Sequence, residues 1–361
     1  MYFKKIALFS AITLSFLSCN KDDQTDTVEN YGGFSYNLHS TIDYDAIDVK
    51  SRGFTGARSS TQLLVFEDME HFKATLAELE RQVEELDSAF LEYYPDLDGD
   101  SLITIEEEIG FNEEDPLYNF GEKLHFHTLH ADIATAEEEW LDNEELDEEN
   151  DPDDYFVFDE SVRTLLNADN EVQIGNSIYK LVEEGYFEIV DGDVNSLRVL
   201  DPASTSSMRI NASTLPENIV FHGESNEGNA KVNLFDDCKG MKRDVYWGYG
   251  NRRKIKCVVS HWNNPWGSRR VAAKTKNYRK KKRRWKKYRT TCYAKVYGHI
   301  SGWGGDCSTM ENFNSGNSYA RKRRRKKVKH KINVQTKTKS GWVKGWHKGA
   351  GSVERNTVLN W

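Results

Sequence analysis

The chain has 361 residues, which is enough for two or three domains, and 30% of them are charged. Its net charge of −9 conceals an uneven distribution: residues 239–361 hold 35 of the 49 Lys and Arg residues but only 4 of the 58 acidic residues. This split excludes one evenly charged body and indicates two regions with opposite electrostatic roles.

The amino-terminal residues 1–18 have the pattern of a signal peptide. Lys4 and Lys5 form a basic start, and residues 6–17 form an apolar run of roughly 12 residues, too short to span a membrane. We expect cleavage before Cys19 and lipid attachment to this cysteine, because acyl chains contribute roughly 0.8 kcal/mol per buried CH₂ to membrane binding. The alternative is an ordinary secretory signal that contains a cysteine. No later apolar run approaches the roughly 18 residues of a transmembrane helix.

The segment after Cys19 contains one lysine and two acids within Asn20–Asp23. A cysteine followed closely by lysine and paired acids resembles the anchor of surface-exported lipoproteins of Bacteroidetes. Phe16 and Leu17 are bulkier than the commonest lipoprotein cleavage motif, but such bulk is frequent in that group. The resemblance implies an outer-membrane lipoprotein that contacts the membrane through its lipid and is exposed at the cell surface.

Residues 19–60 are polar and lack a period, so we predict a tether. Residues 61–150 are predicted to form an acidic helical domain. Apolar side chains recur at helical spacing over Phe72–Phe90, and Pro95 ends this helix. A second apolar stripe over 129–140 and a shorter helix over 116–124 complete a small bundle.

An acidic segment between the first two helical stripes matches an EF-hand loop in its spacing. The ligand positions 1, 3, 5, 7, 9 and 12 of such a loop correspond to Asp96, Asp98, Asp100, Leu102, Thr104 and Glu107. Ser101 stands where the loop needs a glycine with positive φ. Calcium is therefore the candidate cofactor. The alternative is an acidic loop whose aspartates cap the start of a helix.

Residues 151–190 are predicted as a helix followed by a β-hairpin. A polar-capped helix covers 156–167, alternating residues flank Gly175-Asn176, and a third short strand follows over 186–190. The segments around Arg163–Asn167 and Ile174–Lys180 resemble uncharacterised Bacteroidetes lipoproteins, and with the acidic helical region this resemblance covers about 120 residues. It implies fold and location, and no activity. Residues 191–237, rich in Asp, Ser, Asn and Gly, are predicted as a linker.

In residues 238–361 the period changes to two. Apolar and cationic residues alternate over Ile255–Val259, Thr290–Val296 and Val328–Thr336, and similar stretches near 269–278, 342–346 and 353–361 bring the expected strands to roughly six. We predict a small antiparallel β-sandwich rich in Lys and Arg, with its cations facing outward. The predicted class is therefore α+β multidomain, with an acidic bundle, a helix–hairpin segment and this sandwich.

Four cysteines fall in the same basic region. An exported chain meets oxidising conditions, so we expect two disulfides, and sequence alone leaves three pairings open. The cysteines concerned are Cys238, Cys257, Cys292 and Cys307.

Two cationic runs with interleaved aromatic residues are candidates for binding a polyanion. They consist of Arg279, Lys280, Lys281, Lys282, Arg283, Arg284, Trp285, Lys286, Lys287, Tyr288 and Arg289, and of Arg321, Lys322, Arg323, Arg324 and Arg325. In a first interpretation the runs guard solvated sheet edges. In a second they grip an anionic glycan or another polyanion, since Arg fits sulfate and phosphate. In a third they pair with the chain's own acidic half, in a manner weakened by salt.

A non-enzymatic lipoprotein is the function that these features favour, with a basic domain that engages an anionic glycan at the cell surface. Nucleic acid is the less favoured partner, because no recognition motif accompanies the cations. GxSxG and HExxH are absent from the sequence, as is a phosphate-binding glycine loop. Two alternatives remain open: an envelope hydrolase, and a structural protein whose acidic and basic halves pair.

Overall fold

The computed structural model describes residues 27–53, 61–183, 185–200, 215–223, 242–250, 252–262, 265–266, 270–303, 309–331, 337–349 and 354–360. The predicted signal peptide, Cys19, Cys238 and Cys307 lie outside these residues. The described chain combines helices with largely antiparallel sheets, so the predicted α+β class is confirmed. None of the described helices is both long and apolar enough to cross a membrane.

The helices follow the apolar stripes of the sequence. They are α1 (Met69–Tyr93), α2 (Gly99–Ile109), α3 (Asp115–Lys123), α4 (Leu129–Leu141) and α5 (Glu160–Thr164), with 3₁₀ turns η1 (Glu148–Asn150) and η2 (Val194–Leu200). The predicted helices over 72–90, 116–124 and 129–140 are confirmed as α1, α3 and α4. Helix α1 begins after Asp68, whose carboxylate accepts a hydrogen bond from the His71 backbone N–H at 2.8 Å.

The tether prediction is wrong for much of residues 27–51. Strands β1 (Thr27–Tyr31), β2 (Phe34–Leu38) and β3 (Asp48–Ser51) lie in this segment. Phe34 explains the order of the first hairpin, because its ring centroid lies 5.6 Å from that of Phe90 and 5.8 Å from that of Phe111. Aromatic residues too sparse to form a visible period thus attach the segment to the helices.

A mixed six-stranded sheet has the order β3-β4-β5-β6-β7-β8. Its other strands are β4 (Gln62–Phe66), β5 (Glu171–Ile174), β6 (Ser177–Val182), β7 (Gly185–Ile189) and β8 (Ile219–Gly223). The predicted hairpin around Gly175-Asn176 and the strand after it are confirmed. The predicted linker 191–237 instead contributes η2 and β8. Strand β4 runs parallel to β5. This pairing joins the segment before the helices to the segment after them.

Two further antiparallel sheets form the carboxyl-terminal half. The inner sheet has the order β12-β11-β10-β9, with β16 paired to β11, and the outer sheet has the order β14-β13-β17-β18, with β15 paired to β13. The inner strands are β9 (Lys242–Gly250), β10 (Arg253–Trp262), β11 (Arg270–Lys281), β12 (Arg284–Lys287) and β16 (Arg325–Lys331). The outer strands are β13 (Thr290–Trp303), β14 (Thr309–Asn314), β15 (Ser318–Arg323), β17 (Lys337–Gly349) and β18 (Arg355–Asn360).

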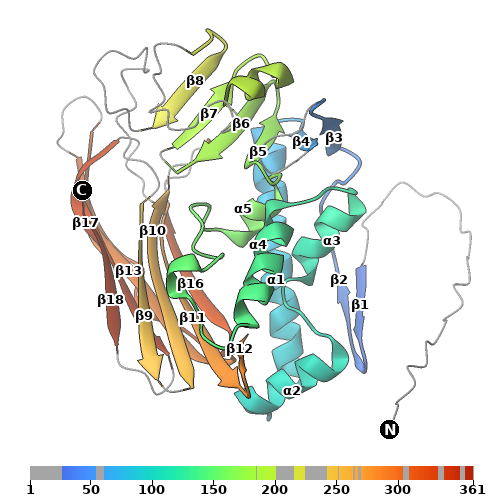
Figure 1. The fold of residues 1–361 in the computed structure, drawn as a ribbon, viewed down its shortest axis with the longest axis vertical. Coiled ribbons are helices and arrows are strands. Elements are labelled where there is room, and N and C mark those ends of the chain that lie inside the picture. The colour runs from blue at the N-terminus through green and yellow to red at the C-terminus, as the bar shows by residue number, and fades with distance from the viewer. Residues whose placement is uncertain are drawn as a thin grey trace, which may run out of the picture.

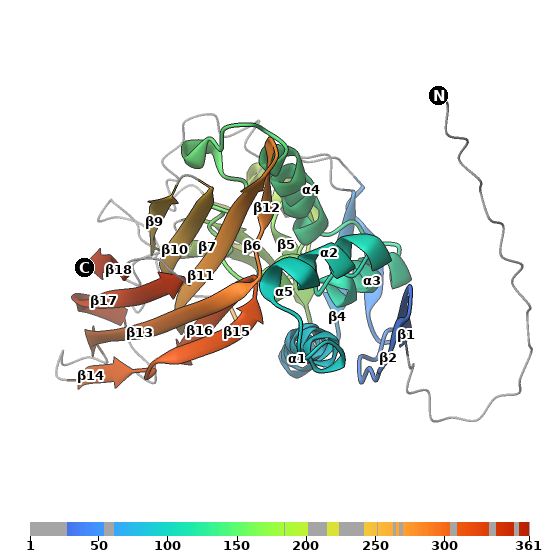
Figure 2. The same cartoon turned by 90° about the horizontal axis from the view of Figure 1, so that it is seen from below.

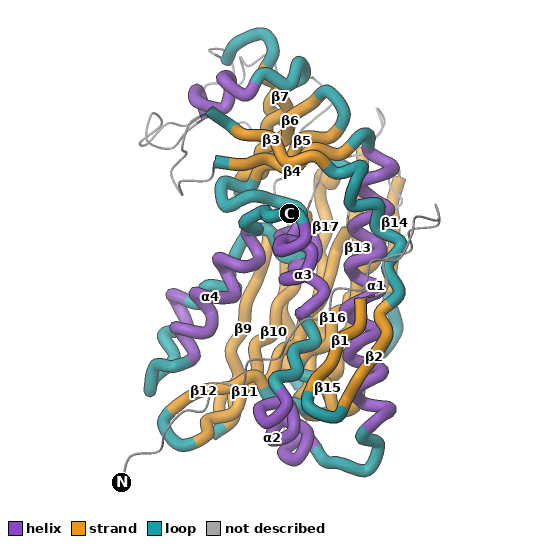
Figure 3. Tube along the Cα trace, turned by 90° about the vertical axis from the view of Figure 1, so that its right-hand side faces the viewer, coloured by secondary structure: helices purple, strands orange, loops and turns teal. Residues whose placement is uncertain are grey.

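The inner and outer sheets share one hydrophobic core. Val259 and Ala273 of the inner sheet are buried in the same cluster as Ala294, Val296 and Val343 of the outer sheet. Figure 1 places the inner sheet between the helices and the outer sheet, and Figure 2 shows the same order from below. Figure 3 shows the six-stranded sheet stacked on one end of this assembly. The inner sheet therefore has one face toward the outer sheet and the other toward the helices.

The disulfide prediction is wrong for the two described cysteines, which are both free and buried. Cys257 is fully buried in the inner sheet, and burial raises the pKa of its thiol to about 12. Burial likewise raises the pKa of Cys292 to about 12, where the sulfur accepts a hydrogen bond from the Asn277 amide at 2.7 Å. Both therefore act as small, unreactive core residues.

Candidate functional site: the ion-pair interface between helices and inner sheet

The helix-facing side of the inner sheet carries cations at alternate positions of three adjacent strands. Lys256 of β10 lies opposite Lys276 of β11, which in turn lies opposite Arg325 of β16. In the neighbouring row Lys274 lies opposite Lys327. Like charges placed directly opposite one another destabilise a sheet. This face therefore needs anions from another part of the fold.

Two buried aspartates between η1 and α5 meet the first row of cations. The Asp153 carboxylate lies 2.7 Å from the Lys276 ammonium and 3.3 Å from that of Lys256, which also pairs with Asp151. Arg163 holds the other oxygen of Asp153 at 2.8 Å. In the sequence these aspartates look like part of a polar chain break, yet each is only 5% exposed. The segment is thus an electrostatic contact rather than a boundary.

Helix α5 meets the second row and also Arg325 of the first row. Glu160 lies 3.1 Å from the Lys274 ammonium, 3.0 Å from the Arg325 guanidinium and 3.1 Å from the Lys327 ammonium. The preceding residue, Asp159, lies 3.3 Å from Lys327 and caps the helix. The predicted helix over 156–167 is therefore reduced to one short helix, whose acidic first turn faces the cations.

A fully buried arginine forms a second centre near α2. The Arg289 guanidinium lies 2.8 Å from Asp87 of α1 and 2.5 Å from Glu106 of α2. Arg324 shares Glu106 at 2.9 Å and reaches Glu113 at 3.1 Å. Two arginines and three carboxylates are thus enclosed together, and their charges are nearly balanced.

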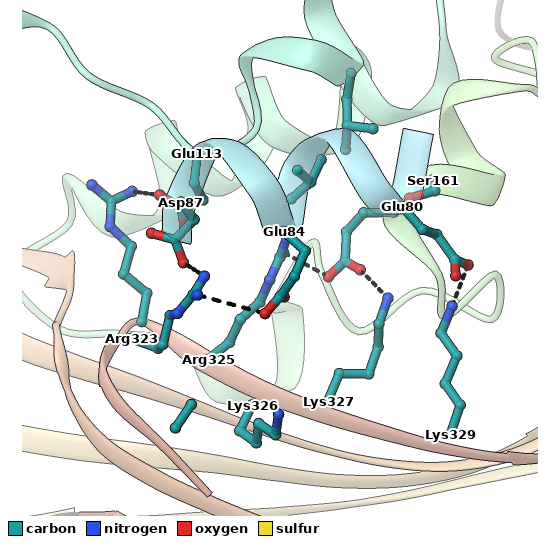
Figure 4. Close-up of a pocket in the computed structure, with 15 residues that line it drawn as sticks. Glu80, Glu84, Asp87, Glu113, Ser161, Arg323, Arg325, Lys326, Lys327 and Lys329 are labelled. Atoms are coloured by element: carbon teal, nitrogen blue, oxygen red, sulfur yellow. Dashed lines mark hydrogen bonds and ion pairs between the residues drawn. The ribbon is translucent and has the colours of Figure 1, made fainter. Parts of the chain in front are cut away.

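An acidic ridge on α1 faces strands β15 and β16. Glu80, Glu84 and Asp87 are spaced four and three residues apart, which places them on one helix face. Arg323 pairs with Asp87 and lies 3.5 Å from Glu84, while Lys329 pairs with Glu80. Figure 4 shows these cations pointing from the strands toward the helix, around a cavity of about 310 Å³. Apart from Lys326, the charged residues that line this cavity already have ion-pair partners.

Aromatic residues seal the edge of the interface beside α4. Trp140 of α4 packs against Trp247 of β9, with ring centroids 5.9 Å apart, and Trp247 packs against Tyr278 at 5.4 Å. The Trp285 indole N–H donates to the Glu144 carbonyl at 3.3 Å. Trp285 and Tyr288, the aromatic residues of the predicted binding run, are only 6% and 8% exposed. Their rings therefore pack within the protein.

The buried charges strongly affect one another. Burial acts to raise the pKa of the Glu160 carboxyl, but the charges of Arg325, Lys274 and Lys327 outweigh it and hold the pKa well below its ordinary value. The pKa of Asp153 is lowered in the same way against burial, with Lys274 as the strongest cation. Burial also lowers the pKa of Lys274 to about 8. Removing each ion from water costs several kcal/mol, so the interface depends on every charge having partners.

Most of the predicted polyanion-binding cations are engaged by the chain itself. Those paired with carboxylates of the acidic half are Arg279, Lys281, Arg284, Lys286, Lys287, Arg289, Arg323, Arg324 and Arg325. Lys280 and Lys322 donate to the backbone carbonyls of Glu144 and Pro95. Lys282, Arg283 and Arg321 are exposed and form no ion pair with a described residue.

The EF-hand-like loop predicted over Asp96–Glu107 is wrong as a conformation, because Gly99–Ile109 is helix α2. Asp98 caps this helix by accepting a hydrogen bond from the Ser101 backbone N–H at 2.8 Å. Ser101 lacks the freedom for positive φ that the loop requires, and the capping aspartate favours the helix. The alternative expectation, a capped helix start, is thus confirmed.

The other predicted calcium ligands also have helical roles. Leu102 is fully buried in the core, and the Thr104 hydroxyl donates to the Asp100 carbonyl at 3.0 Å. The Asp100 carboxylate pairs with Arg279, and Glu107 lies 3.3 Å from Lys281. Across the described residues, no group of three or more His, Cys, Asp or Glu side chains is arranged to hold a metal ion.

Helix α2 closely approaches the connection between β12 and β13. A Cβ placed on Gly99 would lie 2.1 Å from the Arg289 carbonyl oxygen. Only glycine fits at this contact between the start of α2 and the connection, so Gly99 allows the acidic and basic halves to pack closely here.

Sequence reasoning left pairing with the acidic half as one of three interpretations and did not identify the acidic partners of the inner sheet. The alternation of Arg323, Arg325, Lys327 and Lys329 indicates a strand face made entirely of cations. Such a face, combined with an acidic helix ridge elsewhere in the chain, was the available signal for an internal interface.

No family model matches the chain, and no curated protein matches it. Among solved structures the chain is similar to a DUF4848 family protein from Bacteroides thetaiotaomicron, at 9% identity and a TM-score of 0.20, over 83% of this chain and 97% of that chain. A likeness at this TM-score carries no argument about function.

Proposed function

We propose that the chain is a non-enzymatic lipoprotein, anchored in the outer membrane through lipid on Cys19 and exposed at the cell surface. Its acidic helices and its Lys/Arg-rich β-sandwich act as one structural body. The observation that carries this proposal is the buried ion-pair interface around Asp153, Glu160 and Arg289. Residues 1–19 and the segment Asn20–Asp23 support the anchor.

Pairing of the two halves accounts for the charge asymmetry better than an external ligand on this face. The cations of β10, β11 and β16 lie beneath helices and loops, with Lys256 and Lys274 each 1% exposed. A polyanion would have to displace intramolecular carboxylates that are held at high effective concentration. The acidic half therefore neutralises the inner sheet.

Calorimetry of the chain without residues 1–18, carrying Cys19→Ser, tests the structural pairing. Because the interface is buried and charged, we expect one cooperative unfolding transition. Residues 238–361 expressed alone should aggregate, since their buried cations would lose all partners. Two separate transitions, together with a folded isolated fragment, would contradict the proposal.

Membrane fractionation tests the anchor separately. Cys19→Ser should move the protein from the membrane to the soluble fraction and abolish labelling by a lipid precursor. Intact cells bearing the wild-type chain should lose it to external protease. Asp22→Asn with Asp23→Asn is the matched variant for display, because it should retain lipid labelling while reducing protease access.

A second candidate function is binding of an anionic glycan through the exposed remainder of the cationic runs. Lys282 and Arg283 form the tip of the β11–β12 hairpin, and Lys282 adopts φ 59° there. Retention on heparin and its salt dependence test this candidate. Elution that is unchanged by Lys282→Gln with Arg283→Gln would remove the tip as a site.

A further inference from the structure

The outer sheet has a second ordered face, directed away from the helices. Along β13, Ala294 and Val296 are fully buried toward the core, while Tyr293, Lys295 and Tyr297 alternate with them and are half-buried. The outward side chains of this face thus follow a strict period of two.

Strand register pairs aromatic side chains with cations across this face. Tyr293 of β13 lies opposite Lys348 of β17, and Tyr297 lies opposite Lys344. Between them the order reverses, since Lys295 lies opposite Trp346. The last row places His299 opposite Trp342. The two central strands therefore present an alternating pattern of rings and positively charged or imidazole groups.

The rings form two clusters that together extend over three strands. Tyr293 lies 5.8 Å from Tyr319 of β15 and 6.1 Å from Trp346, measured between ring centroids. Tyr297 lies 5.9 Å from Trp342. We call these five aromatic residues, with Lys295, Lys344 and Lys348, the outer aromatic face.

Cation–π contacts hold two lysines close to their rings. The Lys344 ammonium lies 5.1 Å from the Trp342 ring centroid, and the Lys295 ammonium lies 5.2 Å from that of Tyr297. Tyr319 is 57% exposed and Trp342 36% exposed. Solvent-exposed rings beside cations held in place form a surface that is preorganised for a ligand.

Carboxylates are scarce on this face. Among the described residues, Glu354 is the acid that contacts it, 3.6 Å from the Lys348 ammonium and 3.2 Å from the Trp346 indole nitrogen. Lys295 and Lys344 form no ion pair with a described residue. Figures 1 and 2 show the helices on the far side of the inner sheet, away from this face. Lys295 and Lys344 are therefore available to an external anion.

The stability of the outer sheet does not by itself explain why these aromatic residues are exposed. Cross-strand aromatic pairs contribute roughly 0.2–1 kcal/mol each to a sheet. That contribution does not require exposed rings, and the same strands already have a buried core on their other side. Exposed apolar area of this kind marks an interaction site.

We propose that the outer aromatic face binds a linear acidic polysaccharide. The apolar C–H face of a sugar ring packs against Tyr and Trp, and its carboxylate or sulfate group reaches the intervening lysines. Outward side chains recur roughly 6.6 Å apart along a strand, a spacing of the same order as one sugar unit. Alternation of rings and cations suits a chain that carries acidic groups at intervals.

Single-stranded nucleic acid fits this pattern less well. Each nucleotide brings a phosphate, so such surfaces combine stacking rings with a continuous cationic groove along the backbone. On the outer aromatic face the lysines are interspersed among rings that pack edge-on against one another. The glycosidic backbone of a polysaccharide is itself uncharged and needs no such groove, so the chemistry favours an acidic polysaccharide.

The test uses the chain that lacks residues 1–18 and carries Cys19→Ser. Its binding of polygalacturonate is measured by tryptophan fluorescence and by titration calorimetry. Trp342→Ala with Tyr319→Ala should weaken binding by about tenfold or more, because it removes the two most exposed rings. Lys295→Gln with Lys344→Gln should weaken binding and reduce its salt dependence. Fully methyl-esterified pectin, which lacks the charge, should bind more weakly than polygalacturonate.

The matched control is Lys50→Gln with Lys73→Gln, which removes two exposed lysines of β3 and α1 and should bind as wild type. Near-ultraviolet circular dichroism should show that all variants remain folded. Absence of polygalacturonate binding would overturn the proposal, as would tighter binding of oligo(dT) or loss of binding only in the control variant. The inference does not depend on pairing of the halves or on the anchor, since neither involves the outer aromatic face.

Discussion

The inner and outer sheets of the carboxyl-terminal half have similar strands but different partners. On the helix-facing side of the inner sheet, Lys256, Lys274 and Lys276 are each at most 4% exposed and meet carboxylates from the acidic half. On the outer sheet, Lys295 and Lys344 lie beside aromatic rings and face away from the helices. Alternating lysines thus serve an internal interface on one sheet and an open surface on the other.

This difference shows that cationic alternation does not by itself identify a ligand surface. Where acidic segments of the same chain cover the cations, burial and pairing become conditions for folding. Where tyrosine and tryptophan replace the carboxylates, Lys295 and Lys344 lie beside aromatic rings and form no ion pair with a described residue. The identity of the neighbouring groups separates the two roles.

Among the tests of this difference between the two sheets, the largest effect is expected from acid, which should unfold the interface between the helices and the inner sheet. Because the folded-state pKa values of Asp153 and Glu160 lie well below their ordinary values, their stabilisation is present above the unfolded pKa, about 4, and is lost as pH falls below it. We expect stability to rise with pH in this acidic range and the two halves to unfold together at pH about 2 to 3. Circular dichroism against pH measures this, and a flat profile would contradict it.

A single buried carboxylate should have the next largest effect. Asp153→Asn leaves several buried cations without their shared anion, so we expect a loss of about 3–5 kcal/mol in the free energy of unfolding. Urea denaturation measures the loss. The control is Glu149→Gln, an exposed acid of the same half, with an expected change within about 0.5 kcal/mol. Equal effects of the two substitutions would be inconsistent with a structural interface.

Pairs at the rim of the interface should matter much less. Arg279 and Asp100 are 38% and 51% exposed, so Arg279→Gln should cost less than about 1 kcal/mol. Raising salt should reduce the difference between wild type and variant, because exposed pairs are screened. A cost comparable to that of Asp153→Asn would mean that the rim and the centre contribute alike.

The smallest expected effect concerns calcium. Because α2 is helical and its acids pair with Arg279 and Lys281, the melting temperature should be the same with calcium and with chelator. Differential scanning fluorimetry measures it. A calcium-dependent rise would indicate that the segment can adopt the predicted loop.

Local patterns predicted the elements well because they depend on neighbours along the chain. The apolar stripe Phe72–Phe90 became α1, and the turn at Gly175-Asn176 became a hairpin. The prediction was wrong where two local signals competed, as at Asp98, which fits both a calcium loop and a helix cap. It was also wrong at Cys257 and Cys292, which are free and buried.

The sequence by itself determined where helices and strands form, which strand positions are apolar, and that acidic and basic residues are segregated along the chain. Only the tertiary structure decided which basic face the acidic half covers, because Asp153 and Lys276 are distant in sequence and meet through packing. A period of two assigns a side chain to one face of a strand, but the partner of that face is set by long-range contacts. The same contacts leave the rings of Trp342 and Tyr319 open to solvent.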